Sequence, residues 1–300
     1  MTPLSRRRFL TISAACAALP TGVAAAPSAQ WRGTALGASA SLRLEGLTDA
    51  QAAPIIAAIE AEVTRLENIF SLYRPDSQLS RLNRDGHLPA PAPELLSVLS
   101  LCGSLHRATD GAFDPTIQPL WMALATGASA DQIKAARETI GWDKVRVQPD
   151  AIHLPHPGQS GLTLNGIAQG AITDRIAALL RGHGLRDVLV DMGEIAALGR
   201  RGDGQNWRVG VTGPGGAIHK RIELRDRAIA TSDAGTLRLT DQHGHILSPN
   251  GEALHHQALS VSAPDAALAD GLSTALCALT DTQADAVLAQ FPDARIEMRV

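Results

Sequence analysis

The second half of the chain contains a run of short segments with strand-like patterns. Six of them lie between residues 186 and 263 and read RDVLVDMG, NWRVGVTG, KRIELRD, TLRLT, GHILSP and ALSVSA. Alternation of polar and apolar residues is typical of strands that bury one face. Turns containing glycine, proline or aspartate separate several of these segments, which favours antiparallel hairpins. Helical patterns lie on both sides of the run, so we expect an α+β fold with mixed, largely antiparallel sheets and packed helices.

Apolar residues spaced three or four positions apart mark the helices. Ile55, Ile59, Val63, Leu66 and Phe70 recur in this way and predict a helix through residues 53–70. The same reading predicts further helices at 93–108 and 131–141, and two more before a final strand at 294–300. It also predicts a strand at 39–44 and a hairpin at 144–155. A short strand at 161–164 is expected to lead through a corner into a long helix.

Length and composition are consistent with one domain. A chain of 300 residues with 45% hydrophobic residues can bury a sizeable core, and no segment resembles a linker. We therefore expect a single domain over residues 27–300. Aromatic residues make up 3% of the chain, which gives no support to nucleic-acid binding by base stacking. Residues 27–300 carry 24 basic and 30 acidic residues, a formal charge of −6, which argues against binding of polyanions.

Residues 1–26 have the pattern of an export signal. Three consecutive arginines at 6–8 precede Phe9 and Leu10, and a mildly apolar run with small residues near 24–27 follows. This pattern resembles the twin-arginine signal of bacteria, and the alternative is an ordinary secretory signal. Both readings predict a periplasmic protein. The apolar run is too short to span a bilayer comfortably, and we expect no transmembrane segment in the mature chain.

Cys102 and Cys277 both lie within apolar helical patterns. The periplasm permits disulfides, but such patterns favour buried free thiols.

Two turns are candidate ligand contacts. The loop at 108–116, ATDGAFDPT, places a glycine beside Phe113, where the backbone can approach a flat ligand closely. The corner at 163–170, TLNGIAQG, runs into the start of a helix, and a helix N-terminus favours phosphate. A capped turn and a simple helix cap are the structural alternatives for these two segments.

Residues 243–256 contain four histidines, at 243, 245, 255 and 256. Their spacing matches no zinc motif, and no cysteine joins them. A single histidine that acts as a general base is a better interpretation than structural zinc.

The helical segment ALADGLSTALCAL, residues 267–279, carries Asp270, Ser273 and Thr274 among small apolar residues. Positions 270 and 274 share one helix face. Carboxylate and hydroxyl oxygens suit magnesium better than softer metals. A local hydrogen bond between these side chains is the alternative, unless another segment supplies further oxygens.

In chain order, these segments resemble the ApbE family, the FAD:protein FMN transferases of bacterial envelopes. The resemblance runs from about residue 33 to about residue 276. It rests on IFSLYRPDSQLSRLN, TDGAFDPTIQPLW, GIAQGAITD, AIATSDAG, GHILSP and ADGLSTA. It implies the architecture of those enzymes, which is related to the T-fold.

The resemblance also implies a reaction. A Thr or Ser hydroxyl of an acceptor protein attacks the FMN-side phosphorus of FAD, with Mg²⁺ at the pyrophosphate, and AMP leaves. The metal ligands implied are the Gly166 carbonyl, Asp270, Ser273 and Thr274. His245 is the implied base. The residues implied to bind FAD are Leu36, Tyr73, Ala112, Phe113, Asp114, Thr163, Gln169 and Ile246.

The chain departs from the family pattern at several of these positions. Thr163 stands where the family usually has aspartate, and Gln169 stands where it usually has lysine. Two further functions therefore stay open, a flavin carrier without transfer and a periplasmic FAD pyrophosphatase. The export signal resembles that of NosX-type members, which implies as acceptor a protein of a membrane electron-transfer complex, such as a NosR-like protein.

Overall fold

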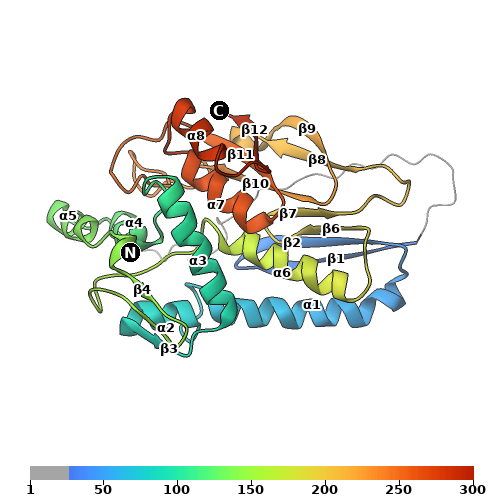
Figure 1. The fold of residues 1–300 in the computed structure, drawn as a ribbon, viewed down its shortest axis with the longest axis horizontal. Coiled ribbons are helices and arrows are strands. Elements are labelled where there is room, and N and C mark those ends of the chain that lie inside the picture. The colour runs from blue at the N-terminus through green and yellow to red at the C-terminus, as the bar shows by residue number, and fades with distance from the viewer. Residues whose placement is uncertain (1–26) are drawn as a thin grey trace.

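The computed structural model describes residues 27–300, and the export signal predicted for 1–26 lies outside them. A seven-stranded sheet forms the centre (Figure 1). Its strands, in spatial order, are β1 (Ser28–Ala35), β2 (Ala38–Glu45), β6 (Val188–Asp191), β7 (Ile195–Leu198), β10 (Arg227–Asp233), β11 (Ala258–Ala263) and β12 (Arg295–Arg299). Each neighbouring pair is antiparallel. The predicted α+β class is confirmed.

Helices cover one face of this sheet. Three of them, α1 (Asp49–Phe70), α6 (Ala168–Gly182) and α7 (Ala266–Leu276), lie along the strands, and α3 (Pro93–Ala108) packs on α7 (Figure 1). Their apolar faces and the sheet form the main core. The predicted helix at 93–108 has the observed bounds, whereas α1 begins four residues before the predicted start. The helix α8 (Asp281–Leu288) precedes β12.

A two-stranded ribbon, β8 (Trp207–Thr212) and β9 (Ile218–Leu224), covers the opposite face. Trp207, Val209 and Leu224 pack there against Leu189 and Ile195 in a second apolar cluster. Because the sheet has apolar partners on both faces, β6 and β7 are buried almost throughout.

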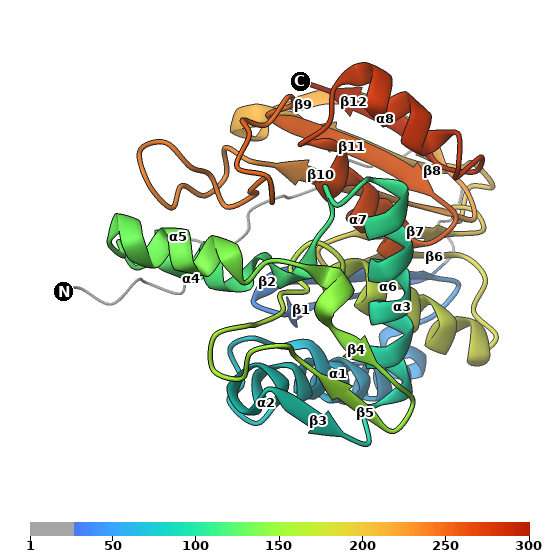
Figure 2. The ribbon, with the colours of Figure 1, turned by 60° about the vertical axis from the view of Figure 1, so that its left-hand side comes forward.

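A smaller unit lies beside α1 and α3. It consists of α2 (Gln78–Asp85) and a sheet in which β5 (Ala151–His153) lies between β3 (His87–Pro89) and β4 (Arg146–Val147). The predicted hairpin at 144–155 is the β4–β5 pair. Two short helices, α4 (Gln118–Ala125) and α5 (Ala130–Glu138), project on the same side as the long loop between β10 and β11 (Figure 2).

Three predicted strands do not form. Residues 236–240 and 244–249 belong to the β10–β11 loop, where an isolated bridge joins Arg238 and Gly244. Residues 161–164 are not paired with any strand of the described chain. The Asn83 side chain takes that place, because its amide bonds both the N–H and the carbonyl of Leu162.

Cys102 and Cys277 are buried free thiols, as the apolar patterns predicted. Burial raises the pKa of both, that of Cys277 to about 12. Within residues 27–300, none of the helices combines the length and apolar character that a membrane span requires.

The helices α6 and α7 cap each other. Asp174 of α6 accepts hydrogen bonds from the N–H groups of Ala266 and Ala267 at the start of α7, at 2.7 and 2.9 Å. In return, Asp270 of α7 accepts from the N–H of Gly170, at 3.1 Å. The first N–H groups of a helix have no partner within the helix, so each carboxylate satisfies donors that would otherwise be unpaired.

Gly170 is needed for this contact. A Cβ at position 170 would lie 2.4 Å from the carbonyl oxygen of Ala266 and 2.6 Å from the Cα of Ala267. Both are backbone atoms, so relief of the clash requires α7 to move away from α6.

We therefore predict that Gly170→Ala lowers the free energy of unfolding by about 2–3 kcal/mol, because it forces the two helices apart. Urea denaturation measures this change. Gly182→Ala is the matched control, since a Cβ there meets no atom within 4 Å. It should be neutral or slightly stabilising, because alanine favours a helix over glycine. Equal stability of the two variants would contradict the packing argument.

Candidate functional site

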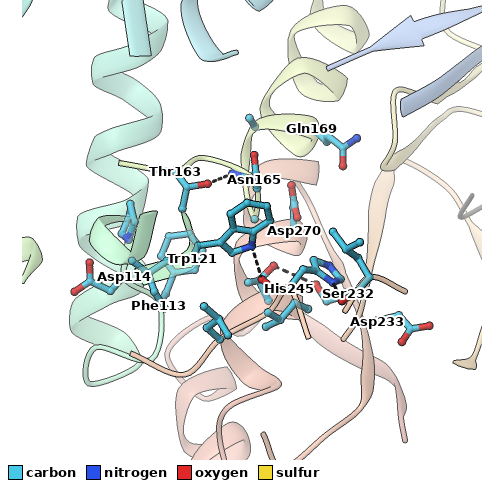
Figure 3. Close-up of a pocket in the computed structure, with 18 of the residues that line it drawn as sticks. Phe113, Asp114, Trp121, Thr163, Asn165, Gln169, Ser232, Asp233, His245 and Asp270 are labelled. Carbon is cyan, nitrogen blue, oxygen red and sulfur yellow. Dashed lines mark hydrogen bonds between the residues drawn. The ribbon is translucent and has the colours of Figure 1, made fainter. Parts of the chain in front are cut away.

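One cavity, with a volume of about 180 Å³, brings together segments that are far apart in the sequence. It lies where the 109–117 loop, the 163–169 corner, the end of β10, the β10–β11 loop and α7 converge (Figure 3). Among the predicted site residues, Ser273 is the one that does not line it. Those that do are Leu36, Tyr73, Ala112, Phe113, Asp114, Thr163, Gly166, Gln169, His245, Ile246, Asp270 and Thr274.

Gly166, Asp270 and Thr274 line the same cavity and carry a backbone carbonyl, a carboxylate and a hydroxyl group. A Cβ at position 166 would lie 2.9 Å from the Thr274 hydroxyl, so the absence of a side chain lets α7 approach the corner. Asp270 is 4% exposed, and its Oδ2 accepts from Gly170. A carboxylate, a hydroxyl and a backbone carbonyl are hard ligands of the kind that Mg²⁺ prefers.

Ser273 faces away from the cavity into the core. Its hydroxyl donates to the Asp270 carbonyl at 3.0 Å and lies 2.8 Å from the hydroxyl of Ser232 in β10. The Ser232 hydroxyl also lies 3.1 Å from that of Thr274. The two serines therefore tie α7 to β10 and hold the Thr274 hydroxyl, whereas the sequence reasoning had placed Ser273 at the metal.

A second buried carboxylate, Glu194, lines the same cavity and was missed by the sequence reasoning. It is 7% exposed, and its Oε2 accepts from the N–H of Thr231 at 3.3 Å. Burial, and then the charges of Asp270 and Asp191, raise the pKa of Glu194 well above its usual range. Burial also raises the pKa of Asp270, to about 7. Negative charge is therefore costly here unless a cation accompanies it.

Aromatic residues are concentrated at this cavity. The chain has nine Phe, Tyr and Trp residues, and three of them, Tyr73, Phe113 and Trp121, line the wall. Such side chains provide flat apolar surface for a ring system. Leu36 adds to this wall from the β1–β2 turn, where its N–H donates to Glu67 at 2.9 Å.

The 109–117 loop is held by its own polar groups. The hydroxyl of Thr109 accepts from the N–H of Phe113 at 3.0 Å, and the His106 ring lies 3.0 Å from the Phe113 carbonyl. The Asp114 carboxylate accepts from the N–H and hydroxyl of Thr116 and from the N–H of Trp142. Because these contacts occupy Asp114, its evident effect is to fix the loop that presents Phe113.

Thr163 and Gln169, the two positions that depart from the family pattern, have different surroundings. The Thr163 hydroxyl accepts from the N–H of Asn165 at 3.2 Å, which stabilises the corner (Figure 3). The amide nitrogen of Gln169 is buried and has no partner within residues 27–300, and it lies against Gly193. A buried amide donor without an acceptor is costly, so a ligand oxygen at this position would be favourable.

His245 reaches the cavity from the β10–β11 loop. Its Nδ1 lies 3.3 Å from the carbonyl of Leu237 in the same loop. Burial lowers the pKa of His245, an effect that the Leu237 carbonyl and the Asp233 charge partly oppose. A neutral imidazole with one ring nitrogen directed at its own loop keeps the other as an acceptor, as a general base requires.

Several cavity residues carried no recognisable signal in the sequence. Trp121 is the last residue of TDGAFDPTIQPLW, and Asn165 lies inside TLNGIAQG, but neither residue type at its position indicates a specific role. Glu194 is the one acid in the apolar stretch EIAAL, and an isolated carboxylate immediately before a buried strand is the signal that points to it. Ser232 lies inside the segment AIATSDAG, where a serine does not by itself indicate a contact with Ser273 or Thr274.

Comparison with known sequences identifies one family. The ApbE family model matches residues 36–298. The FAD:protein FMN transferase of Treponema pallidum is 32% identical over 282 residues, which cover 80% of this chain and 76% of that protein. The protein of the same name from Salmonella typhimurium is 27% identical over 91% of this chain and 85% of its own length.

Solved structures of ApbE proteins have a similar fold. The Pseudomonas stutzeri flavinyl transferase ApbE in its apo form is 26% identical and superposes with a TM-score of 0.77, covering 92% of this chain and 94% of that one. The Vibrio cholerae flavin transferase ApbE shares the fold, with a TM-score of 0.79 at 24% identity over 90% and 94% of the two chains. Since the family model spans most of its length, this chain belongs to the ApbE family.

Proposed function

We propose that this protein is an FAD:protein FMN transferase that uses a divalent cation, Mg²⁺, and releases AMP. The observation that carries the proposal is the cavity itself, which is lined by three aromatic side chains and by the buried Asp270, together with the half-buried Thr274 and Gly166. An aromatic wall suits the ring of a flavin, and hard oxygens suit a cation at its pyrophosphate. The curated relatives named above carry this activity in their names.

The residues present fit a divalent cation. The Asp270 carboxylate, the Thr274 hydroxyl and the Gly166 carbonyl would hold it, and a bound cation would neutralise charge on the pyrophosphate during phosphoryl transfer. Burial has raised the pKa of Asp270 to about 7, and a neighbouring positive charge would favour its ionised form. The N-terminus of α6, next to Gly166, adds a partial positive charge that favours phosphate.

The chain's own side chains bind and orient the substrates. Phe113, Trp121 and Tyr73 would contact the flavin ring, and the buried Gln169 amide would donate to a ligand oxygen. The acceptor's Thr or Ser hydroxyl forms a bond to the FMN-side phosphorus while the bond from that phosphorus to the AMP oxygen breaks. His245 would take the proton of the attacking hydroxyl.

The location and partner of the protein rest on the sequence. The Ser5–Leu10 segment supports twin-arginine export to the periplasm. The acceptor would then be a periplasmic part of a membrane electron-transfer complex, and a NosR-like protein is the proposed example. The low aromatic content and the acidic charge give no support to nucleic acid as a partner.

Asp270→Asn should change stability in a pH-dependent way. Because the pKa of Asp270 is raised, its proton stabilises the folded state fully below about pH 4, and this contribution is lost as the pH rises through 7. Without divalent cations, the variant should therefore melt at a higher temperature than wild type at pH 8, and close to it at pH 4. Adding MgCl₂ should raise the melting temperature of wild type only.

Differential scanning fluorimetry measures these shifts. Asp85→Asn is the control, because Asp85 is an exposed carboxylate outside the cavity, and this variant should follow wild type. Identical responses of wild type and Asp270→Asn to pH and to MgCl₂ would argue against a cation site.

FMN transfer can be tested directly. The mature protein is incubated with FAD, MgCl₂ and an acceptor domain that carries a D-x-x-[Ser/Thr]-G-A-[Ser/Thr] segment. We expect a fluorescent acceptor band on a denaturing gel, equimolar AMP, and loss of both with Asp270→Ala. AMP and free FMN without a labelled acceptor would indicate a pyrophosphatase instead, and tight FAD binding without AMP release would indicate a carrier.

The pH–rate profile tests the base. The transfer rate at saturating FAD should fall as the pH drops through a value below 6.5, because burial lowers the pKa of His245 and protonation removes its acceptor. His245→Ala should be slower by about 10²–10⁴-fold. His243→Ala is the control, since His243 lies in the same loop and bonds Thr240 outside the cavity. An acidic limb that His245→Ala leaves unchanged would assign the base elsewhere.

A further inference from the structure

Few hydrogen bonds attach the segment that carries His245 to the rest of the protein, and its other attachment is the packing of Ile246 and Leu254 against the core. Residues 237–245 form a narrow hairpin, in which Arg238 and Gly244 form an isolated bridge and the N–H of His245 donates to the Leu237 carbonyl. Within residues 27–300, one hydrogen bond joins the stretch 237–254 to any other part of the chain. It runs from the indole Nε1 of Trp121 to the carbonyl oxygen of His245, over 3.1 Å.

The donor of this bond sits on a well-anchored helix. Trp121 belongs to α4, whose Leu120 and Leu124 are buried. The turn before α4 is capped by Asp114, which also bonds the backbone of Trp142. The indole therefore projects from a helix with buried anchors toward the long β10–β11 loop (Figure 3).

We propose that Trp121 is a positioning residue for His245. Its indole N–H holds the His245 backbone and thereby sets where the imidazole lies in the cavity, while its ring forms part of the aromatic wall. The consequence for catalysis rests on the proposed function, whereas the attachment of the loop does not.

The two contributions of Trp121 can be separated. Trp121→Phe keeps an aromatic ring on the wall but removes the N–H donor, so it should leave flavin binding nearly intact and release the hairpin. Trp31→Phe is the matched control. Its indole N–H also donates to a distant segment, at Glu60 over 2.9 Å, but it lies outside the cavity.

Two measurements on the mature protein test the proposal. The first is the rate of tryptic cleavage after Arg238, an exposed residue of the hairpin, followed by mass spectrometry. The second is transfer kinetics with FAD and the acceptor domain, in the wild-type and His245→Ala backgrounds. A thermal melt checks that each variant is folded.

Loss of one neutral hydrogen bond corresponds to roughly fivefold in an equilibrium. We therefore expect Trp121→Phe to speed cleavage after Arg238 by about fivefold and to lower kcat by a similar factor, with KM for FAD changed less than about twofold. Trp31→Phe should match wild type. In the His245→Ala background, Trp121→Phe should have little further effect on kcat, because its effect acts through that imidazole.

Equal cleavage rates for the Trp121→Phe, Trp31→Phe and wild-type proteins would overturn the attachment. A raised KM with unchanged kcat, or an equal loss of kcat with and without His245, would mean that Trp121 only lines the cavity and does not position His245. Failure of the proposed function is distinguishable, since the wild-type protein would then transfer no FMN while the cleavage comparison would still report on the hairpin.

Discussion

The site depends on the reciprocal capping of α6 and α7. Asp174 satisfies the first N–H groups of α7, and Asp270 satisfies the N–H of Gly170 in α6. Helices can come this close only because Gly170 has no side chain. The same approach places Thr274 beside the backbone of Gly166. The packing of α7 against α6 and the corner before it therefore sets where Asp270 and Thr274 lie relative to Gly166.

The burial of two carboxylates at this cavity costs folding free energy, and that cost points to a function. Asp270 and Glu194 are both nearly inaccessible to water, and burial raises the pKa of each. A chain selected for stability alone would gain from replacing such a pair with apolar residues. Buried carboxylates at the wall of a cavity are instead typical of functional sites, where a cation or a substrate group compensates for their burial. The aromatic wall on the other side of the cavity supplies the complementary apolar surface.

The sequence predicted the parts of the fold that local patterns determine. The helix at 93–108 followed from the spacing of its apolar residues, because one face of it is buried. The strand at 258–263 was also predicted, and it is buried on both faces. The strands expected at 236–240 and 244–249 did not form, since strand pairing depends on neighbours that a local pattern does not reveal. Most of the site residues that the family resemblance implied line one cavity in the structure. Ser273 points into the core instead, because its hydroxyl bonds Ser232 and its own helix.

The central claim is that Asp270 and its neighbours hold a divalent cation that binds the pyrophosphate of FAD. The most direct test is the affinity for FAD, measured by fluorescence titration of the wild-type protein in MgCl₂ and in EDTA, with Asp270→Asn alongside. The account predicts that Mg²⁺ tightens FAD binding by at least about tenfold in wild type, a difference of about 1.4 kcal/mol, and has little effect in the variant. Equal FAD affinity with and without Mg²⁺ in the wild-type protein would contradict it.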